Sequence, residues 1–223
     1  MLLSKYFFRG EFTEYEQALR ALGARPAELA RGVYFTDLIN PDRDIYFISE
    51  GVIRFTLIGD SGRENHLMYF GPGELFPFVL PHISSAISTN LIAEVVEPVK
   101  GLSFSPLLVE KLIRSCPDFA VKAAQHLLSE VRLLLTRELL NHSTSPEFRV
   151  CSFLYLFDQS GPSPEHVLHF THSEVAAAVG LSRVQVSRVI GRLRDAGVLE
   201  TGRGHIKIKN MKKLRFCCGE KAE

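Results

Sequence analysis

The sequence has no apolar run long enough to cross a membrane, and its first residues lack the pattern of a signal peptide. Its four cysteines, Cys116, Cys151, Cys217 and Cys218, show neither paired Cys-x-x-Cys spacing nor a disulfide framework. Such cysteine usage is typical of a reducing compartment. We therefore expect a cytoplasmic protein with no membrane partner.

The sequence also lacks the common patterns of enzymes. It contains no nucleophile elbow and no glycine-rich loop that would hold a phosphate. The first hundred residues offer only His66 and His82, without the His-x-His spacing that metal-dependent barrel enzymes use. We expect no catalytic residues, no bound metal and no enzymatic activity.

Residues 171–194 have the pattern of two short helices joined by a tight turn. Thr171 with Glu174, and Ser182 with Gln185, can each form a capping box, and Gly180 can take a positive φ between the helices. Two apolar stripes follow at helical spacing, made by Val175, Ala178 and Val179 and by Val186, Val189, Ile190 and Leu193. Helices this short bury such stripes by packing on each other, which predicts a helix-turn-helix.

The second helix carries polar side chains away from its apolar stripe: Arg183, Gln185, Ser187, Arg188 and Arg192. From Thr171 to Arg215 there are ten Lys and Arg residues against three acidic ones, whereas residues 1–142 carry 14 basic and 17 acidic residues. The near-neutral net charge of +1 thus conceals a basic end, as expected of a DNA-binding module. A solvated helical hairpin is the alternative, and this charge distribution disfavours it.

The rest of the chain predicts an α+β protein in three parts. Residues 1–106 contain short strands (46–58, 66–70, 91–96 and 101–104) with Pro98 at a corner, which is typical of an antiparallel β-barrel or jelly-roll. Residues 107–142 form two helices, the second from Asp118 to about Leu140. Residues 143–223 follow a polar hinge at 141–145 and combine a Pro146 helix, a short strand at 167–170, the helix pair and a basic hairpin at 198–208, which makes a winged helix-turn-helix.

The long helix carries an apolar seam that predicts a homodimer. Val121, Ala124, Leu128, Val131 and Leu135 step by three and four along the sequence, as in a coiled coil. We expect Leu127, Leu134 and Leu139 to pack on the protein's own barrel. The alternative, that the seam also packs on the barrel, remains open.

A barrel, a long helix, a hinge and a winged helix-turn-helix, in that order, resemble the cyclic AMP receptor protein/fumarate–nitrate regulator (CRP/FNR) family of bacterial transcription factors. The most specific segments are Gly180-Leu181-Ser182-Arg183, Val186-Ser187-Arg188, Gly51-Val52 and Gly73-Glu74-Leu75-Phe76. The resemblance implies a barrel of the cyclic-nucleotide-binding type, a palindromic double-stranded DNA operator, a homodimer and RNA polymerase as a partner. Within the family, the aromatic barrel and valine-rich recognition helix most resemble the halophenol-responsive, CprK-like regulators.

Two departures from the family concern the effector. Members that bind cyclic nucleotides place an Arg-Ser pair on the phosphate, but no Lys or Arg occurs here from Glu64 to Val99, so we expect no response to cyclic AMP. Members that sense oxygen hold an iron–sulfur cluster on N-terminal cysteines, whereas the first cysteine here is Cys116. We expect no cofactor and a small apolar or aromatic effector instead.

The expected effector site draws on the barrel and on the long helix. Its residues are Phe70, Glu74, Leu75, Phe76, Phe78, His82, Ser84 and Ser85 of the barrel and His126, Leu127 and Glu130 of the helix, the last three forming a relay to the DNA-binding domain. Two alternatives stay open. One is a haem- or gas-sensing regulator with His82 as an axial ligand, and the other is a filled barrel in a protein that binds DNA without a ligand.

A third departure concerns base reading. Many family members place Glu where this chain has Val184, and valine offers only a methyl contact, which favours thymine over cytosine. We expect Arg188 to contact guanine or phosphate and Arg183 mainly phosphate. The expected DNA-binding residues are Thr171, Ser182, Arg183, Val184, Gln185, Ser187, Arg188, Arg192 and Arg203.

Overall fold

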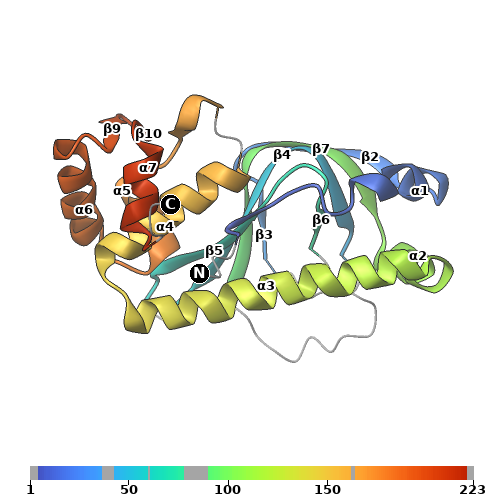
Figure 1. Ribbon diagram of the computed structural model, residues 1–223. Coiled ribbons are helices and arrows are strands. Elements are labelled where there is room, and N and C mark those ends of the chain that lie inside the picture. Colours follow the sequence, from blue (N-terminus) through green and yellow to red (C-terminus); the bar gives the residue numbers. More distant parts are fainter. Residues whose placement is uncertain (1–4, 37–42, 60, 78–89, 162–163, 220–223) are drawn as a thin grey trace. The chain divides into compact units, whose positions relative to one another are not determined.

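The computed structural model describes residues 5–36, 43–59, 61–77, 90–161 and 164–219 (Figure 1). These residues divide into two compact units. Unit 1 comprises the described residues of Met1–Tyr6, Arg63–His66 and Val131–Glu223, and unit 2 those of Phe7–Gly62 and Leu67–Glu130. Helix α3 (Pro117–Ser143) contributes residues to both units. The predicted α+β fold, with an N-terminal barrel-like sheet, a long helix and a C-terminal helix-turn-helix domain, is confirmed.

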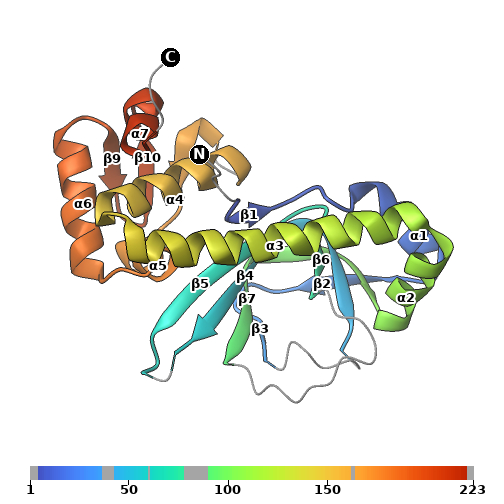
Figure 2. The ribbon, with the colours of Figure 1, turned by 60° about the horizontal axis from the view of Figure 1, so that its bottom comes forward.

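Unit 2 is built on a seven-stranded sheet of order β1-β5-β4-β7-β2, with β3 paired to β7 and β6 paired to β4 (Figures 1 and 2). The strands are β1 (Phe7–Phe8), β2 (Arg25–Leu29), β3 (Tyr34–Phe35), β4 (Ile45–Ile58), β5 (Glu64–Phe70), β6 (Leu75–Phe76) and β7 (Leu91–Phe104). β7 pairs antiparallel with β2, β3 and β4, whereas β1 pairs parallel with β5. The sequence pattern missed β1, β3 and β6, which have two residues each, too few to show alternation, and β2, which has no buried residue to mark it.

The long strands β4 and β7 correct one prediction. A corner at Pro98 is wrong, because β7 runs without a break from Leu91 to Phe104. The register shifts between Glu50 and Val52 place two residues of β7 opposite Gly51 alone, which is a β-bulge. Pro98, which has no N–H to donate, is tolerated at such an irregularity in the ladder.

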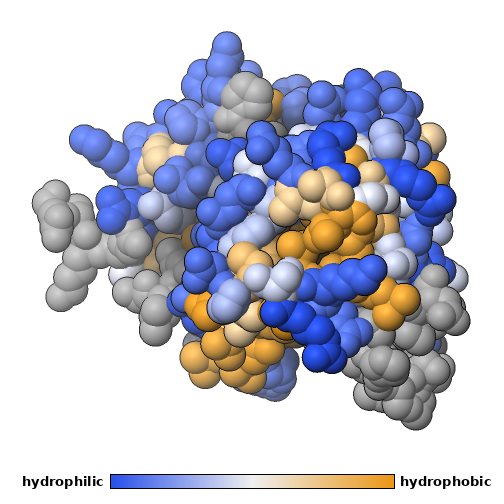
Figure 3. Space-filling view, turned by 90° about the vertical axis from the view of Figure 1, so that its right-hand side faces the viewer, coloured by the Kyte–Doolittle hydropathy of each residue, from blue (hydrophilic) through white to orange (hydrophobic). Residues whose placement is uncertain are grey.

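Helices and strands together bury the core of unit 2. Besides the sheet, unit 2 contains the 3₁₀ turn Thr13–Tyr15 and the helices α1 (Glu16–Ala21) and α2 (Pro106–Ser115). The buried cluster includes Phe12, Leu19, Ile45, Phe47, Leu75, Leu102, Phe104, Val109, Leu112 and Phe119. Figure 3 looks at the end of this unit where α1 and α2 lie, and shows hydrophobic residues gathered among hydrophilic ones. Exposed apolar side chains of α2 and of the segment after α1 include Leu107 and Leu22.

Unit 1 contains the C-terminal domain, a helical domain with a small sheet of order β8-β10-β9. Its elements are α4 (Pro146–Ser160), a 3₁₀ turn (Pro164–His166), β8 (Val167–Leu168), α5 (His172–Val179), α6 (Arg183–Asp195), β9 (Leu199–Gly202), β10 (His205–Ile208) and α7 (Met211–Cys217). The predicted start of α4 is confirmed: the Ser145 side chain accepts a hydrogen bond from the Phe148 N–H, and Pro146 occupies the first turn. β9 and β10 form the predicted antiparallel wing.

Two details of this unit differ from the sequence expectation. The hinge is shorter than predicted, because α3 continues through Asn141 and His142 to Ser143 and leaves only Thr144 and Ser145 before α4. Polar residues alone do not end a helix, whereas Pro146 forces the residue before it out of the helical region. The sequence pattern also did not predict α7, which is capped by Asn210 and is followed by the buried Cys218.

Gly51 offers a test of the bulge. Its φ is +94°, and a Cβ there would lie 2.1 Å from the Pro98 carbonyl oxygen. Gly51→Ala therefore combines left-handed strain with a backbone clash, and we expect it to lower the free energy of unfolding by about 3 kcal/mol or more. Gly62→Ala is the matched control, since Gly62 has φ +75° but open space around it; strain alone costs about 1–2 kcal/mol. Urea unfolding curves for both variants make the comparison, and equal losses would contradict the role given to Pro98.

Candidate DNA-binding surface and effector site

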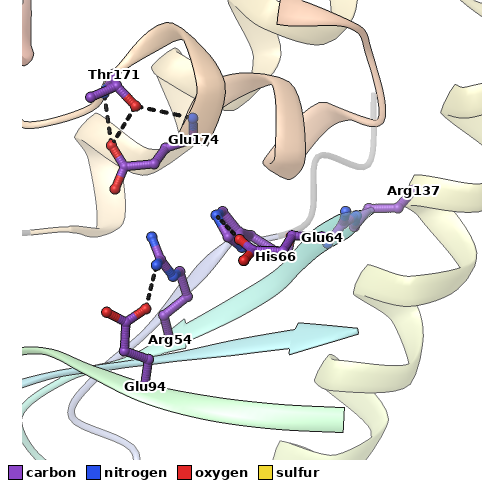
Figure 4. Close-up of polar contacts among 7 residues, drawn as sticks. All are labelled: Arg54, Glu64, His66, Glu94, Arg137, Thr171 and Glu174. Carbon is purple, nitrogen blue, oxygen red and sulfur yellow. Dashed lines mark hydrogen bonds and ion pairs between the residues drawn. The ribbon is translucent and has the colours of Figure 1, made fainter. Parts of the chain in front are cut away.

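The helix-turn-helix forms as the sequence predicts. Thr171 Oγ1 accepts from the Glu174 N–H at 3.2 Å, while Glu174 Oε2 accepts from the Thr171 N–H at 2.8 Å (Figure 4). Ser182 and Gln185 repeat this box at 3.2 and 3.0 Å. Gly180 takes φ +67° between α5 and α6. Both reciprocal caps satisfy amides that a helix start leaves without partners, so each helix begins at a defined residue.

Helix α6 buries one face and exposes another. Val186, Val189, Ile190 and Leu193 are buried. On the other side Ser182, Arg183, Gln185, Arg188 and Arg192 are exposed, and Val184 is 59% exposed. Ser187 is half-buried, and its Oγ lies 2.9 Å from His172 Nδ1. The exposed face thus offers long hydrogen-bond donors beside a bare methyl surface, which is what reading base edges in a groove requires.

A cavity of about 380 Å³ lies where α5, α6 and the wing meet. It is lined by Phe170, Thr171, His172, Ser173, Arg183, Gly202, Gly204 and His205. Burial and the Arg183 charge lower the pKa of His172, so its ring is neutral at pH 7. The start of α5 carries the positive end of the helix dipole. Arg203, exposed at the wing turn, is the residue between the two lining glycines, so this side of the domain is suited to a phosphate.

Arg192 lies in a different environment from the other predicted DNA-binding residues. Its Nη2 donates to Glu147 Oε2 of α4 at 3.0 Å, near the end of α6. It lines a second cavity, formed with α7, rather than the cavity beside the wing. The structure therefore brings Thr171 and Arg183 together with the wing but does not bring Arg192 there.

Three arginines hold the turn of the helix-turn-helix, and the sequence reasoning missed this role. Arg137 donates to the Ala178 carbonyl at 2.9 Å, Arg149 to the Val179 carbonyl at 3.4 Å and Arg63 to the Leu181 carbonyl at 2.9 Å. The carbonyls of Ala178 and Val179 lie in the last turn of α5, where a helix leaves its acceptors unsatisfied, and that of Leu181 lies in the turn before α6. The guanidinium groups take the place of helical N–H donors and add favourable charge at the negative end of the dipole.

In unit 2, a buried acid and a buried histidine face each other. Glu74 is 0% exposed, and its Oε1 accepts from the Glu11 N–H at 3.1 Å. Its other oxygen, Oε2, lies 3.6 Å from His126 Nδ1 of α3 and has no hydrogen-bond partner among the described residues. His126 Nε2 lies 2.9 Å from Glu130 Oε1. The rings of Phe8, Phe12 and Phe70 pack 5.2–6.4 Å from the imidazole, centroid to centroid.

This environment raises the pKa of both Glu74 and His126. Burial raises the pKa of Glu74 to about 7, against the opposing attraction of His126 and the Glu11 hydrogen bond. Burial alone would lower the pKa of His126, but contact with Glu130 and the charges of Glu74, Glu130 and Glu11 together raise it. A carboxyl whose pKa lies near 7, with one oxygen lacking a partner inside an aromatic cage, is a group that a polar ligand atom could engage.

The remaining predicted effector residues divide into three groups. Phe70, Leu75 and Phe76 are buried, with Phe70 and Phe76 5.2 Å apart between ring centroids. Phe78, His82, Ser84 and Ser85 lie outside the described residues. Leu127 is exposed, as are Leu134 and Leu139, so the prediction that these leucines pack inward is wrong.

The inward face of α3 is a different seam, made by Phe119, Ala123, His126, Leu133 and Arg137, all buried. They also step by three and four if Glu130 is included, so the signal was present in the sequence. The histidine, glutamate and arginine among them concealed it. The predicted dimer seam is exposed throughout: Val121, Ala124, Leu128, Val131 and Leu135 all lie on the surface of the chain.

One further polar contact joins two strands of the sheet in unit 2. Arg54 of β4 and Glu94 of β7 are paired across the sheet and face each other in Figure 4. Within the part of the chain that the structure describes, no group of three or more His, Cys, Asp or Glu side chains is arranged to hold a metal. No helix there combines the length and the apolar character needed to cross a membrane.

An exposed polar recognition helix, a reciprocal capping box before each helix and a basic wing define a DNA-binding protein of the winged helix-turn-helix class. A model of the Crp-like helix-turn-helix domain matches residues 148–217. The chain is 30% identical over 166 residues to the cyclic AMP receptor protein of Thermus thermophilus, covering 74% of each, and 26% identical over 179 residues to the global nitrogen regulator of a Synechocystis strain, covering 77% and 78%. The chain thus belongs to the CRP/FNR family of transcription regulators.

Among solved structures, the CprK protein complexed with OCPA shares the fold. Its TM-score is 0.69 at 18% sequence identity, over 97% of this chain and 99% of that one. Identity this low speaks for the fold alone.

The buried Glu74 and His126 predict a pH-dependent stability. The folded protein keeps the Glu74 proton from pH 4.5 up to about 7, where the unfolded chain has lost it, so the free energy of unfolding falls as pH rises through this window. The raised pKa of His126 continues the fall above pH 6.5. The Glu74 shift corresponds to on the order of 3 kcal/mol. Glu74→Gln should flatten most of this fall, since its amide stays neutral. Urea unfolding at pH 5, 6, 7 and 8 measures it, with the exposed Glu50→Gln as control; an unchanged slope in Glu74→Gln would show that the pair does not titrate as described.

Proposed function

We propose that this chain acts as a homodimeric, sequence-specific transcription regulator whose DNA affinity is set by a small effector bound in unit 2. The observation that carries the DNA-binding part is the exposed face of α6, with Arg183, Val184 and Arg188, of which Arg183 also lines the cavity at the wing. The arginines can donate hydrogen bonds to phosphates and so position the protein on DNA. The methyl groups of Val184 can distinguish thymine from cytosine. RNA polymerase is the proposed partner on the promoter. Because a bacterial regulator meets its DNA in the cytoplasm, the cytoplasm is the proposed compartment.

The exposed seam of α3 supports the homodimer. Leu128 and Leu135 are 68% and 67% exposed, and they lie on one helical face with Val121, Ala124 and Val131. A row of apolar side chains at heptad spacing loses its contact with water when it meets the same row on a second chain. A two-fold dimer then presents two recognition helices to half-sites about 34 Å apart, which predicts a palindromic operator.

For the effector, we propose a small aromatic or apolar molecule with one polar group, rather than cyclic AMP. By resemblance, Gly73-Glu74 matches the Gly-Glu segment that cyclic-nucleotide-binding members use for the ribose, but here Glu74 is buried against His126 among phenylalanine rings. The sequence supplies no cation between Glu64 and Val99 for a cyclic phosphate. The CprK structure complexed with OCPA suggests aryl carboxylates and halophenols as the first compounds to test, and a halophenol-responsive role is the finer version of this proposal.

Helix α3 supplies the proposed relay. It carries His126 against Glu74 in unit 2 and, three turns later, Arg137 against the α5 carbonyl of Ala178 in unit 1. An effector that forms a hydrogen bond with Glu74 Oε2 would compete with His126 for that oxygen. A displacement of His126 would move α3, which also carries Arg137. Such coupling requires the effector to bind the two states of α3 with different affinity.

The whole proposal is tested by selecting bound sequences from a random DNA library with the purified protein. The selection is run without ligand and with separate aromatic acids, halophenols, fatty acids and cyclic AMP. A palindrome enriched only with one aromatic compound would support both the dimer and the effector class. The same palindrome without ligand would remove the effector from the proposal, and enrichment by cyclic AMP alone would overturn the effector class.

The contacts proposed for the recognition helix α6 predict how its variants bind the operator. Arg188→Ala should weaken operator binding by about 1–3 kcal/mol, roughly 5- to 150-fold, through loss of a base or phosphate contact. Val184→Glu should shift the preferred base pair at its position from A·T to G·C, since a carboxylate accepts from cytosine N4. Arg194→Ala is the control, because Arg194 lies on the same helix but pairs with Asp195 at 3.0 Å. Fluorescence anisotropy with single-base operator variants measures all three; a wild-type preference for G·C opposite Val184 would contradict the assignment.

The exposed seam of α3 predicts which substitutions disrupt the proposed dimer. Leu128→Glu with Leu135→Glu places like charges opposite each other in the proposed interface, so the 25.0 kDa chain should sediment as a monomer and lose at least 100-fold in operator affinity. Leu107→Glu, on α2 and 57% exposed, should leave the dimer intact. Sedimentation velocity gives the result. A dimer that persists in the double variant would place the interface elsewhere.

A further inference from the structure

A second cavity, of about 480 Å³, lies in the C-terminal domain between α4, α6 and α7. It is lined by Glu147, Arg192, Leu193, Ala196, Val198, Lys212, Lys213, Phe216 and Cys217. The volume falls within the range of small-molecule sites. Neither the predicted DNA contacts nor the proposed effector site in unit 2 uses it, apart from Arg192.

The lining divides into an apolar floor and a cationic rim. Leu193 and Val198 are buried, while Ala196 is exposed and Phe216, a full aromatic ring, is 68% exposed. A large exposed ring beside buried aliphatic groups is a surface that a ligand could cover. A phosphodiester backbone would leave this floor uncovered, since it has no apolar part.

The rim carries three cations against one carboxylate. Arg192 is paired with Glu147 at 3.0 Å. Lys212 and Lys213 are exposed, and neither ammonium is ion-paired within the described residues. The local charge therefore favours an anion, and a carboxylate would find two ammonium groups and a guanidinium within one cavity.

We propose that this cavity is a second ligand site, and that it binds a small amphiphilic carboxylate such as a medium-chain fatty acid. The head group lies between Lys212, Lys213 and Arg192, and the chain covers Leu193, Val198 and Phe216. Arg192 and Leu193 belong to the recognition helix α6, and the ligand carboxylate competes with Glu147 for the Arg192 guanidinium. Ligand and DNA affinity are then linked, with the same factor in both directions.

Cys217 provides a local readout for this site in the full chain. Cys217 is half-buried and lines the cavity, whereas Cys116, which is also half-buried, lies in unit 2 and outside the cavity. Cys151 and Cys218 are fully buried, and burial raises the pKa of the Cys151 thiol, which keeps it protonated. Iodoacetamide labelling followed by peptide mass spectrometry thus compares a cavity thiol with a control thiol in one molecule.

The experiment measures labelling rates against decanoate concentration, below its micellar range. We expect decanoate to slow labelling of Cys217 at least fivefold and to leave Cys116 unchanged. Lys212→Gln with Lys213→Gln should raise the concentration for half-protection about tenfold, while the exposed Lys100→Gln should not. Decan-1-ol, which has the same chain without the charge, should protect much more weakly.

Four outcomes would overturn the proposal: no protection of Cys217 at millimolar decanoate, equal protection of Cys116, a lysine double variant that binds as the wild type does, or equal protection by decan-1-ol. The last would show an apolar groove that does not recognise a carboxylate. Because the readout is local to α7, a negative result leaves the proposed effector site in unit 2 untouched.

Discussion

The buried guanidinium of Arg137 is the contact on which the arrangement of unit 1 depends. It is 7% exposed, and it donates to the His66 carbonyl at 2.7 Å, to Asn65 Oδ1 at 2.6 Å and to the Ala178 carbonyl at 2.9 Å. Its charge also lies 5.6 Å from the centre of the Tyr6 ring. One side chain of α3 therefore satisfies acceptors from two distant parts of the chain. Without it, these buried carbonyls would lose their donor, which is costly in a medium with no water to replace it.

This arrangement explains how a short helix pair can be held at a defined place on a long helix. The stripes of α5 and α6 fix the two helices against each other, but they do not decide where the pair is attached. The arginine donors on the carbonyls of Ala178, Val179 and Leu181 make that attachment polar and directional. Such directional hydrogen bonds define one position of the helix pair, because the donors and acceptors must meet at a set distance and angle.

The two seams of α3 show the same division between polar and apolar roles. The outward seam is plain valine, alanine and leucine, and it is exposed in the single chain. The inward seam includes His126 and Glu130, which contact each other, and Arg137, which donates to the His66 carbonyl; His126 also faces Glu74. One helix thus exposes an apolar row on one side and buries polar, partly titratable side chains on the other.

The sequence by itself determined the local elements that have short-range causes. The capping boxes at Thr171 and Ser182, the positive φ at Gly180 and the proline start of α4 all depend on residues within four positions, and each was predicted at its residue. Only the tertiary structure decided the rest. The bulge opposite Gly51 joins β4 to a strand some fifty residues later, β1 pairs with a strand about sixty residues away, and the pairing of Glu74 with His126 joins a strand region to a distant helix. A periodic pattern marks which residues share a face, but it does not say which face turns inward. That choice depended on Arg137, His126 and Glu130, polar residues whose burial is stable only because their partners come from elsewhere in the chain.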